Sequence, residues 1–148
     1  MAEKILVIHG PNLNLLGERE PGIYGDESFD SLNKKLVKLS AEYGMECEIF
    51  QSNHEGAIID KLHEARKIFK AVILNAGAYT HYSYAIRDAI AAIKIPVIEV
   101  HISNVFSRDS FRSESVIAPV CSGSISGFGL ESYYLSKSLC RYGKEAVK

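Results

Sequence analysis

The first apolar run of the chain is Ile5-Leu6-Val7-Ile8, and a loop rich in Gly, Pro and Asn, beginning His9-Gly10-Pro11-Asn12, follows it directly. A continuous apolar run rich in β-branched residues is typical of a parallel strand that is buried on both faces. Similar runs recur at Ala71-Val72-Ile73-Leu74 and at Ile95-Pro96-Val97-Ile98-Glu99-Val100. These runs predict the parallel sheet of an α/β protein.

Amphipathic helices are predicted between the strands. Apolar residues recur at spacings of three and four from Phe29 to Tyr43, and Gly44 suits the position that ends such a helix. Further helices are expected at about 55–67, 83–93 and 130–142, and further strands at 45–51 and 120–125. This alternation predicts a doubly wound, five-stranded parallel sheet with helices on both faces, in three layers.

Length and composition indicate one domain over residues 1–148, with 47% hydrophobic and 24% charged residues. The formal net charge of -1 gives no reason to expect a nucleic-acid partner or binding to an anionic membrane. Cys47, Cys121 and Cys140 are far apart in the sequence, as expected for reduced thiols. The first apolar run is too short for a signal peptide or a membrane span, so we expect a cytoplasmic protein.

Polar residues follow the predicted strands. In doubly wound sheets, ligands bind beyond the carboxyl ends of the strands. The residues that follow the first, third and fourth strands include Asn12, Asn14, Arg19, Asn75, His81, Ser103, Arg108 and Arg112. We therefore predict a catalytic cleft at this edge of the sheet.

Glu99 and His101 lie two positions apart on one strand, so their side chains point to the same face. A carboxylate in a buried strand is costly unless it is paired or hydrogen-bonded. The neighbouring imidazole is one suitable partner, which the carboxylate would orient as a proton donor. A purely structural pair at the strand end is the alternative.

The loop from Gly10 to Gly25 is long for a compact domain, and long loops are often lids or binding loops. We expect the lid at about residues 18–25. Tyr24 fits equally well as a hydrophobic plug or as a base. A phenol acts as a base only if its pKa falls from about 10 towards neutrality, which requires roughly 3–4 kcal/mol, and Arg19 would supply part of that.

Several kinds of functional site are excluded because the sequence lacks their motifs. The loop after the first strand lacks both glycine-rich phosphate-binding patterns, and no Cys/His cluster has the spacing of metal ligands. No lysine follows the strands' carboxyl ends to form a Schiff base. Acid–base chemistry on a small anionic, hydroxylated substrate remains, with Arg112, Ser103 and the amides holding its oxygens.

Motifs along nearly the whole chain resemble the type II 3-dehydroquinate dehydratase family. They are Gly10-Pro11-Asn12-Leu13-Asn14-Leu15-Leu16-Gly17 with Arg19-Glu20-Pro21 and Tyr24-Gly25, Gln51-Ser52-Asn53-His54-Glu55-Gly56, Asn75-Ala76-Gly77-Ala78-Tyr79-Thr80-His81, Ile86-Arg87-Asp88-Ala89, and Glu99-Val100-His101-Ile102-Ser103-Asn104 with Arg108 and Phe111-Arg112. They occur in the family's order and spacing.

The resemblance implies a flavodoxin-like fold and a lyase activity without metal or organic cofactor. The reaction would be the anti elimination of water from 3-dehydroquinate through an enolate, giving 3-dehydroshikimate on the shikimate route to aromatic amino acids. Tyr24 would then be the base, with its phenolate favoured by Arg19. His101 would be the acid, supported by Glu99, and Asn12 would lie near the enolate oxygen.

The resemblance also implies residues for binding and assembly. The expected substrate-binding residues are Asn75, His81, Ile102, Ser103 and Arg112. Asp88 would reach the site of a neighbouring subunit in a homododecamer built as four trimers.

The sequence departs from the family at Ser113-Glu114-Ser115, where relatives often carry histidines before a serine, and at Tyr82 and Tyr84. These departures leave the expected catalytic positions intact and affect the subunit contacts and the surroundings of the pocket. The alternative from another class is a non-catalytic flavodoxin-like module that binds a small anion or a nucleotide. A binding module has no need of a base and an acid on the same ligand, so the enzyme is favoured.

Overall fold

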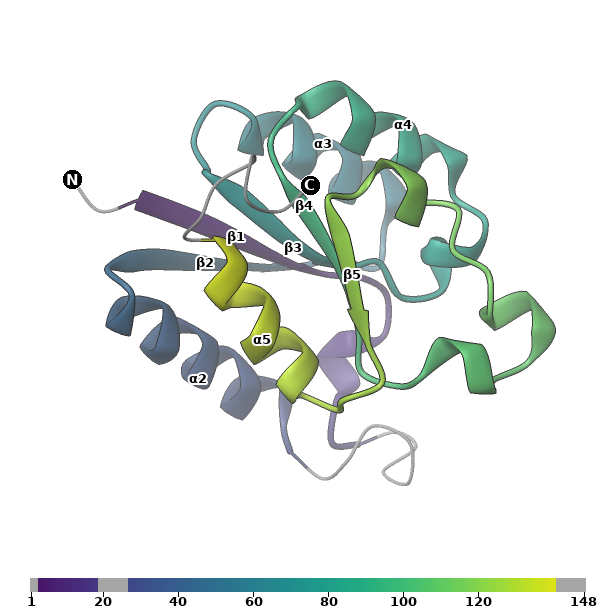
Figure 1. Ribbon diagram of the computed structural model, residues 1–148, viewed down its shortest axis with the longest axis horizontal. Coiled ribbons are helices and arrows are strands. Elements are labelled where there is room, and N and C mark those ends of the chain that lie inside the picture. Colours follow the sequence, from purple (N-terminus) through teal and green to yellow (C-terminus); the bar gives the residue numbers. More distant parts are fainter. Residues whose placement is uncertain (1–2, 19–26, 141–148) are drawn as a thin grey trace.

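The computed structural model describes residues 3–18 and 27–140, and five parallel strands form one sheet within them (Figure 1). The strands are β1 (Glu3–His9), β2 (Met45–Gln51), β3 (Ala71–Asn75), β4 (Val97–His101) and β5 (Gly123–Ser126). Their order across the sheet is β2-β1-β3-β4-β5. The chain therefore adds strands first on one side of β1 and then on the other, which confirms the predicted doubly wound sheet.

Helices cover both faces of this sheet and make three layers (Figure 1). They are α2 (Phe29–Glu42), α3 (Glu55–Ala65), α4 (Tyr84–Ile93) and α5 (Glu131–Leu139). Ser28 and Ser83 begin α2 and α4 by accepting hydrogen bonds from backbone N–H groups three residues on. Gly44, with a φ of 75°, follows the end of α2 as predicted.

The strands divide the core into two apolar clusters, one on each face of the sheet. Alternate residues of β1 belong to different clusters, since successive strand side chains point to opposite faces. Leu32, Leu36 and Tyr133 bring α2 and α5 to the first cluster. The helices α3 and α4 pack on the second. Burial on both faces explains why the central strands β1, β3 and β4 are mostly apolar, whereas the edge strands β2 and β5 are less buried and more polar.

Some predicted boundaries were wrong. The fifth strand begins at Gly123 rather than at residue 120, because Pro119 lies in a 3₁₀ helix, η5 (Ala118–Val120). The loop after β1 contains a 3₁₀ helix, η1 (Leu13–Leu15), although its sequence shows no periodicity. Most of the predicted lid, residues 19–25, lies outside the described residues, as does the predicted end of the last helix at residues 141–142.

No helix in the described part of the chain is long and apolar enough to cross a membrane. Cys47, Cys121 and Cys140 are free thiols, and burial raises the pKa of Cys47 to about 11 and that of Cys140 to about 12. Their thiols therefore stay protonated near neutral pH.

A buried histidine ends β1 on the α2/α5 face. His9 Nε2 lies 2.8 Å from Asn33 Oδ1 on α2, and His9 Nδ1 lies 3.0 Å from the Tyr133 hydroxyl on α5. Because the amide oxygen only accepts, Nε2 carries the proton and Nδ1 accepts from the phenol. Burial lowers the pKa of His9 to about 4, although the bond to Asn33 opposes this shift.

Gly10 marks a close approach of two backbones at the end of β1. A Cβ at this position would lie 2.6 Å from the carbonyl carbon and oxygen of Ala76. We predict that Gly10→Ala lowers the free energy of unfolding by about 3 kcal/mol, because backbone atoms must shift. The matched control is Gly56→Ala in α3, where a Cβ meets no atom within 4 Å. Ala should stabilise that helix by about 0.5–1 kcal/mol. Urea denaturation followed by circular dichroism measures both, and equal effects would contradict the prediction.

His9 should make stability depend on pH. Unfolded His9 binds a proton below about pH 6.5, whereas the folded residue stays neutral down to about pH 4. Its contribution is therefore fully present above pH 6.5 and is lost as the pH falls towards 4, by about 3 kcal/mol. His9→Gln removes the titrating group, so its unfolding free energy should fall less over this range. Denaturation at fixed protein concentration measures both slopes, and identical slopes would refute the assignment.

Candidate active site

A pocket opens at the carboxyl edge of the sheet, where polar residues were predicted to gather. It is bounded by the loop after β1, the 3₁₀ helix η2 (Gly77–His81), and the segment after β4 that includes η3 (Val105–Ser107) and η4 (Ser110–Arg112). Its lining residues are Pro11, Asn12, Leu13, Asn75, Gly77, Ala78, His81, His101, Ile102, Ser103, Val105, Arg108 and Arg112. The structure thus brings seven of the eleven predicted site residues to one place.

The other four predicted residues are not among the described residues that line the pocket. Glu99 lies beneath the pocket, in contact with His101. Asp88 is exposed on α4 and does not line the pocket of its own chain. Arg19 and Tyr24 lie outside the described residues.

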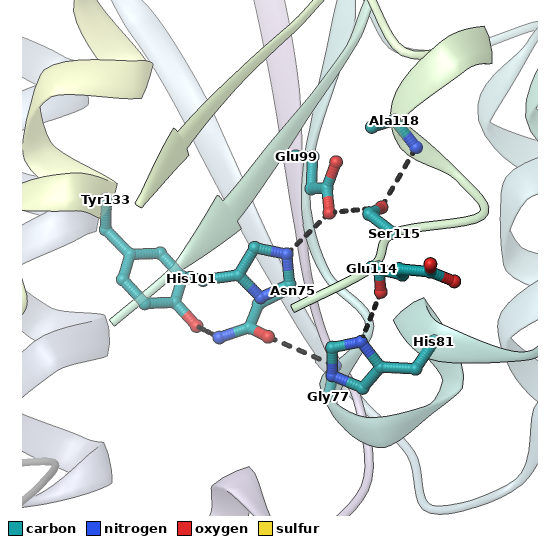
Figure 2. A network of polar contacts seen from close by, with 9 residues as sticks. All are labelled: Asn75, Gly77, His81, Glu99, His101, Glu114, Ser115, Ala118 and Tyr133. Atoms are coloured by element: carbon teal, nitrogen blue, oxygen red, sulfur yellow. Dashed lines mark hydrogen bonds and ion pairs between the residues drawn. The ribbon is translucent and has the colours of Figure 1, made fainter. Parts of the chain in front are cut away.

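Glu99 and His101 form a buried hydrogen-bonded pair in β4. Glu99 Oε2 lies 2.6 Å from His101 Nε2, and the two side chains are 1% and 9% exposed (Figure 2). The predicted pairing is confirmed. Since the carboxylate only accepts, Nε2 carries a proton and donates it, which leaves Nδ1 as the ring nitrogen available to a ligand.

The Glu99 side chain points to the α3/α4 face of the sheet, where the segment from Ser115 to Cys121 covers it. Ile117 in this segment is fully buried in the apolar cluster of that face. Burial is the main cause that raises the pKa of Cys121, and the nearby negative charge of Glu99 adds to it. The pair therefore lies in surroundings where its mutual attraction is weakly screened.

Ser115 is a contact of Glu99 that the sequence analysis did not assign. Its hydroxyl donates to Glu99 Oε2 over 2.7 Å and accepts from the backbone N–H of Ala118 over 3.0 Å (Figure 2). The only signal in the sequence was its place in Ser113-Glu114-Ser115, noted as a departure from the family.

His81 is oriented from the same segment. Its Nδ1 lies 2.6 Å from the backbone carbonyl oxygen of Glu114, which can only accept, so Nδ1 carries the proton. In the neutral imidazole Nε2 is then an acceptor, suited to a ligand hydroxyl.

Asn75 is the last residue of β3, and both the nitrogen and the oxygen of its side-chain amide make hydrogen bonds. Its Nδ2 donates to the Tyr133 hydroxyl over 2.9 Å, and its Oδ1 accepts from the backbone N–H of Gly77 over 3.1 Å (Figure 2). Tyr133 in turn contacts His9, so a continuous chain of hydrogen bonds runs from the α2/α5 core to the pocket. The second Nδ2 hydrogen of Asn75 remains for a ligand.

Arg112 adds a cationic side chain to the pocket. Arg112 is half-buried, and its guanidinium carbon lies 4.8 Å from the centre of the Phe111 ring. A guanidinium is suited to bind a carboxylate through two parallel hydrogen bonds. No group of three or more His, Cys, Asp or Glu side chains within residues 3–18 and 27–140 could hold a metal ion. The pocket thus combines a histidine suited to acid–base chemistry with groups suited to bind hydroxyls and an anion.

Comparisons with known proteins agree with this arrangement. Residues 3–140 match the family described as Dehydroquinase class II. A 3-dehydroquinate dehydratase of Caldicellulosiruptor bescii is 59% identical over 136 residues, which are 90% of this chain and 93% of that protein. One of Bacillus mycoides is 58% identical over 134 residues, covering 90% of this chain and 92% of the relative.

Solved structures extend the likeness to the fold. The type II dehydroquinase from Butyrivibrio crossotus superimposes with a TM-score of 0.93 at 51% identity, covering 95% of this chain and 98% of that one. The type II dehydroquinase from Propionibacterium acnes gives 0.90 at 40% identity, covering 93% and 95%. The family match spans all the described residues, and the solved structures agree with it. The chain belongs to the class II dehydroquinase family.

Proposed function

We propose that this protein is a hydro-lyase that eliminates water from 3-dehydroquinate to give 3-dehydroshikimate. The observation that carries the proposal is the buried Glu99–His101 pair, which leaves one imidazole nitrogen available at a pocket lined by two arginines and two asparagines. Membership of the family, with relatives named 3-dehydroquinate dehydratase, supports the same reaction.

An anti elimination, the course that the family resemblance implies, needs a base and an acid on opposite faces of the ring. Tyr24, as phenolate, removes the C2 proton, and the electron pair passes to the adjacent carbonyl to form an enolate. The enolate then collapses, the C1–O bond breaks, and His101 protonates the departing hydroxyl through Nδ1 to give water. Tyr24 and Arg19 lie outside the described residues, so their roles rest on the family resemblance.

Glu99 supports the acid by electrostatics and geometry. Its negative charge, 2.6 Å from the imidazole, stabilises the protonated ring that must be present before the hydroxyl leaves. The hydrogen bond from Nε2 also fixes the ring plane. A proton donor held in one orientation loses less conformational entropy on reaching the transition state.

The remaining pocket groups suit the substrate's oxygens. Arg112 would pair with the carboxylate, and Asn75, His81 and Ser103 with the ring hydroxyls. The backbone of Ile102 would contribute beside Ser103. Asn12, whose backbone N–H donates to Asn53 Oδ1 over 3.0 Å, lines the pocket and would lie near the enolate oxygen.

We further propose that residues 1–148 act as a single catalytic domain in the cytoplasm, within a homododecamer of four trimers. The exposed position of Asp88 on α4, away from its own pocket, suits a contact with the site of a neighbouring subunit.

Incubation of the purified protein with 3-dehydroquinate tests the proposed reaction. The product is a conjugated enone, so we expect the ultraviolet absorbance to rise with time and to scale with enzyme concentration. His101→Ala, which removes the acid, should lower this rate by roughly 10²–10⁴-fold. If folded wild-type protein produces no absorbance but binds a small anion or a nucleotide, it is a binding module and the proposal is wrong.

The phenol of Tyr24 can be tested separately from binding. We predict that Tyr24→Phe retains the affinity for substrate but loses roughly 10²–10⁴ in kcat, the usual contribution of one positioned proton transfer. Tyr43→Phe, at a half-exposed tyrosine after α2 and remote from the pocket, is the matched control and should retain kcat. Steady-state kinetics gives kcat, and isothermal titration with Tyr24→Phe gives the affinity. An unchanged kcat would identify another group as the base.

A further inference from the structure

Ser115 and His101 share one oxygen atom of Glu99. Oε2 accepts a hydrogen bond of 2.6 Å from His101 Nε2 and one of 2.7 Å from the Ser115 hydroxyl (Figure 2). The other carboxylate oxygen, Oε1, is buried and has no hydrogen-bond partner among the described residues. Within that part of the chain, the position of the carboxylate therefore depends on these two hydrogen bonds.

The direction of the Ser115 hydroxyl is determined by its surroundings. The backbone N–H of Ala118 donates to Ser115 Oγ over 3.0 Å and occupies a lone pair. Glu99 Oε2 has no proton to offer when the carboxylate is charged, so the hydroxyl proton points to it. A hydroxyl that donates to a buried carboxylate offsets part of the cost of removing that charge from water.

The residues on both sides of Ser115 are held by contacts with the rest of the fold. The backbone N–H of Val116 donates to the carbonyl oxygen of Thr80 over 2.9 Å, and Ile117 is fully buried in the core. Glu114 binds His81 through its carbonyl oxygen. The serine hydroxyl therefore reaches Glu99 from a fixed backbone, and its bond can hold the carboxylate still.

We propose that Ser115 is a positioning residue for His101, acting through Glu99. By anchoring Oε2, its hydroxyl keeps the carboxylate where it accepts the hydrogen bond from His101 Nε2, and so keeps Nδ1 directed to the substrate. This inference rests on the proposed function, in which His101 is the acid. It adds a third member to the pair on β4, supplied by a segment that follows β4 in the chain and folds back over the sheet.

The first test compares Ser115→Ala with a neighbouring serine. Ser115→Ala should lower kcat by about 10- to 100-fold with little change in KM, because it misorients the acid without removing a group that binds substrate. Ser113→Ala is the matched control, since that hydroxyl donates only to the carbonyl oxygen of Ser110 and should leave kcat unchanged. Ser115→Thr keeps the hydroxyl, so it should retain most of the wild-type kcat that Ser115→Ala loses.

A double-mutant cycle with Glu99→Gln separates positioning from a structural role. If Ser115 acts through Glu99, Ser115→Ala should lower kcat less than about 2-fold in the Glu99→Gln background. Equal losses in both backgrounds would show that Ser115 merely stabilises its segment, and would overturn the proposal. An unchanged kcat in Ser115→Ala would also overturn it.

A cysteine variant and a prior assay of the wild type separate the role of Ser115 from folding and from the proposed function. Ser115→Cys preserves the side-chain volume but donates weakly, so it should reproduce the loss of kcat even if the alanine variant does not fold. The wild-type product assay is run first. An inactive wild type contradicts the proposed function, whereas an active wild type with a fully active Ser115→Cys contradicts only the role of Ser115.

Discussion

The buried attraction between Glu99 and His101 is the interaction on which the site depends. A charged carboxylate on a strand covered on both faces would destabilise the fold by several kcal/mol if it were left unpaired. Its 1% exposure therefore requires a cationic or hydrogen-bonding partner at a defined place. His101 on the same strand and Ser115 in the segment over Glu99 meet this requirement, and His101 also lines the pocket.

The pocket is anchored in both halves of the core. On the α3/α4 face, His101 connects to Glu99 and Ser115, and this network carries charge. On the α2/α5 face, Asn75 connects through Tyr133 to His9, and this network is neutral. Successive side chains of a strand point to opposite faces of the sheet. Asn75 at the end of β3 and His101 at the end of β4 therefore contact opposite halves of the core, although both lie at the same edge of the sheet. Rigid anchoring on both sides favours a site with a single geometry.

Local patterns predicted most of the fold, because strand and helix periodicities depend on neighbouring residues. The Glu99–His101 contact was equally local, since two positions on a strand share a face. Ser115 was not predictable in this way. It lies in a stretch without periodicity, and its contact depends on how that stretch folds back over the sheet. His9 and Tyr133 are separated by 124 positions and meet only through the tertiary packing of α5.

The two buried strand-end histidines show how surroundings assign a role to one residue type. His9 has both ring nitrogens bound to neutral partners, and burial lowers its pKa to about 4, so it remains an uncharged structural link. His101 has a carboxylate at one nitrogen and the pocket at the other. Only this second arrangement suits a positively charged ring and a proton donor at the pocket. The partner, rather than the position at the end of a strand, thus makes a histidine suitable as an acid.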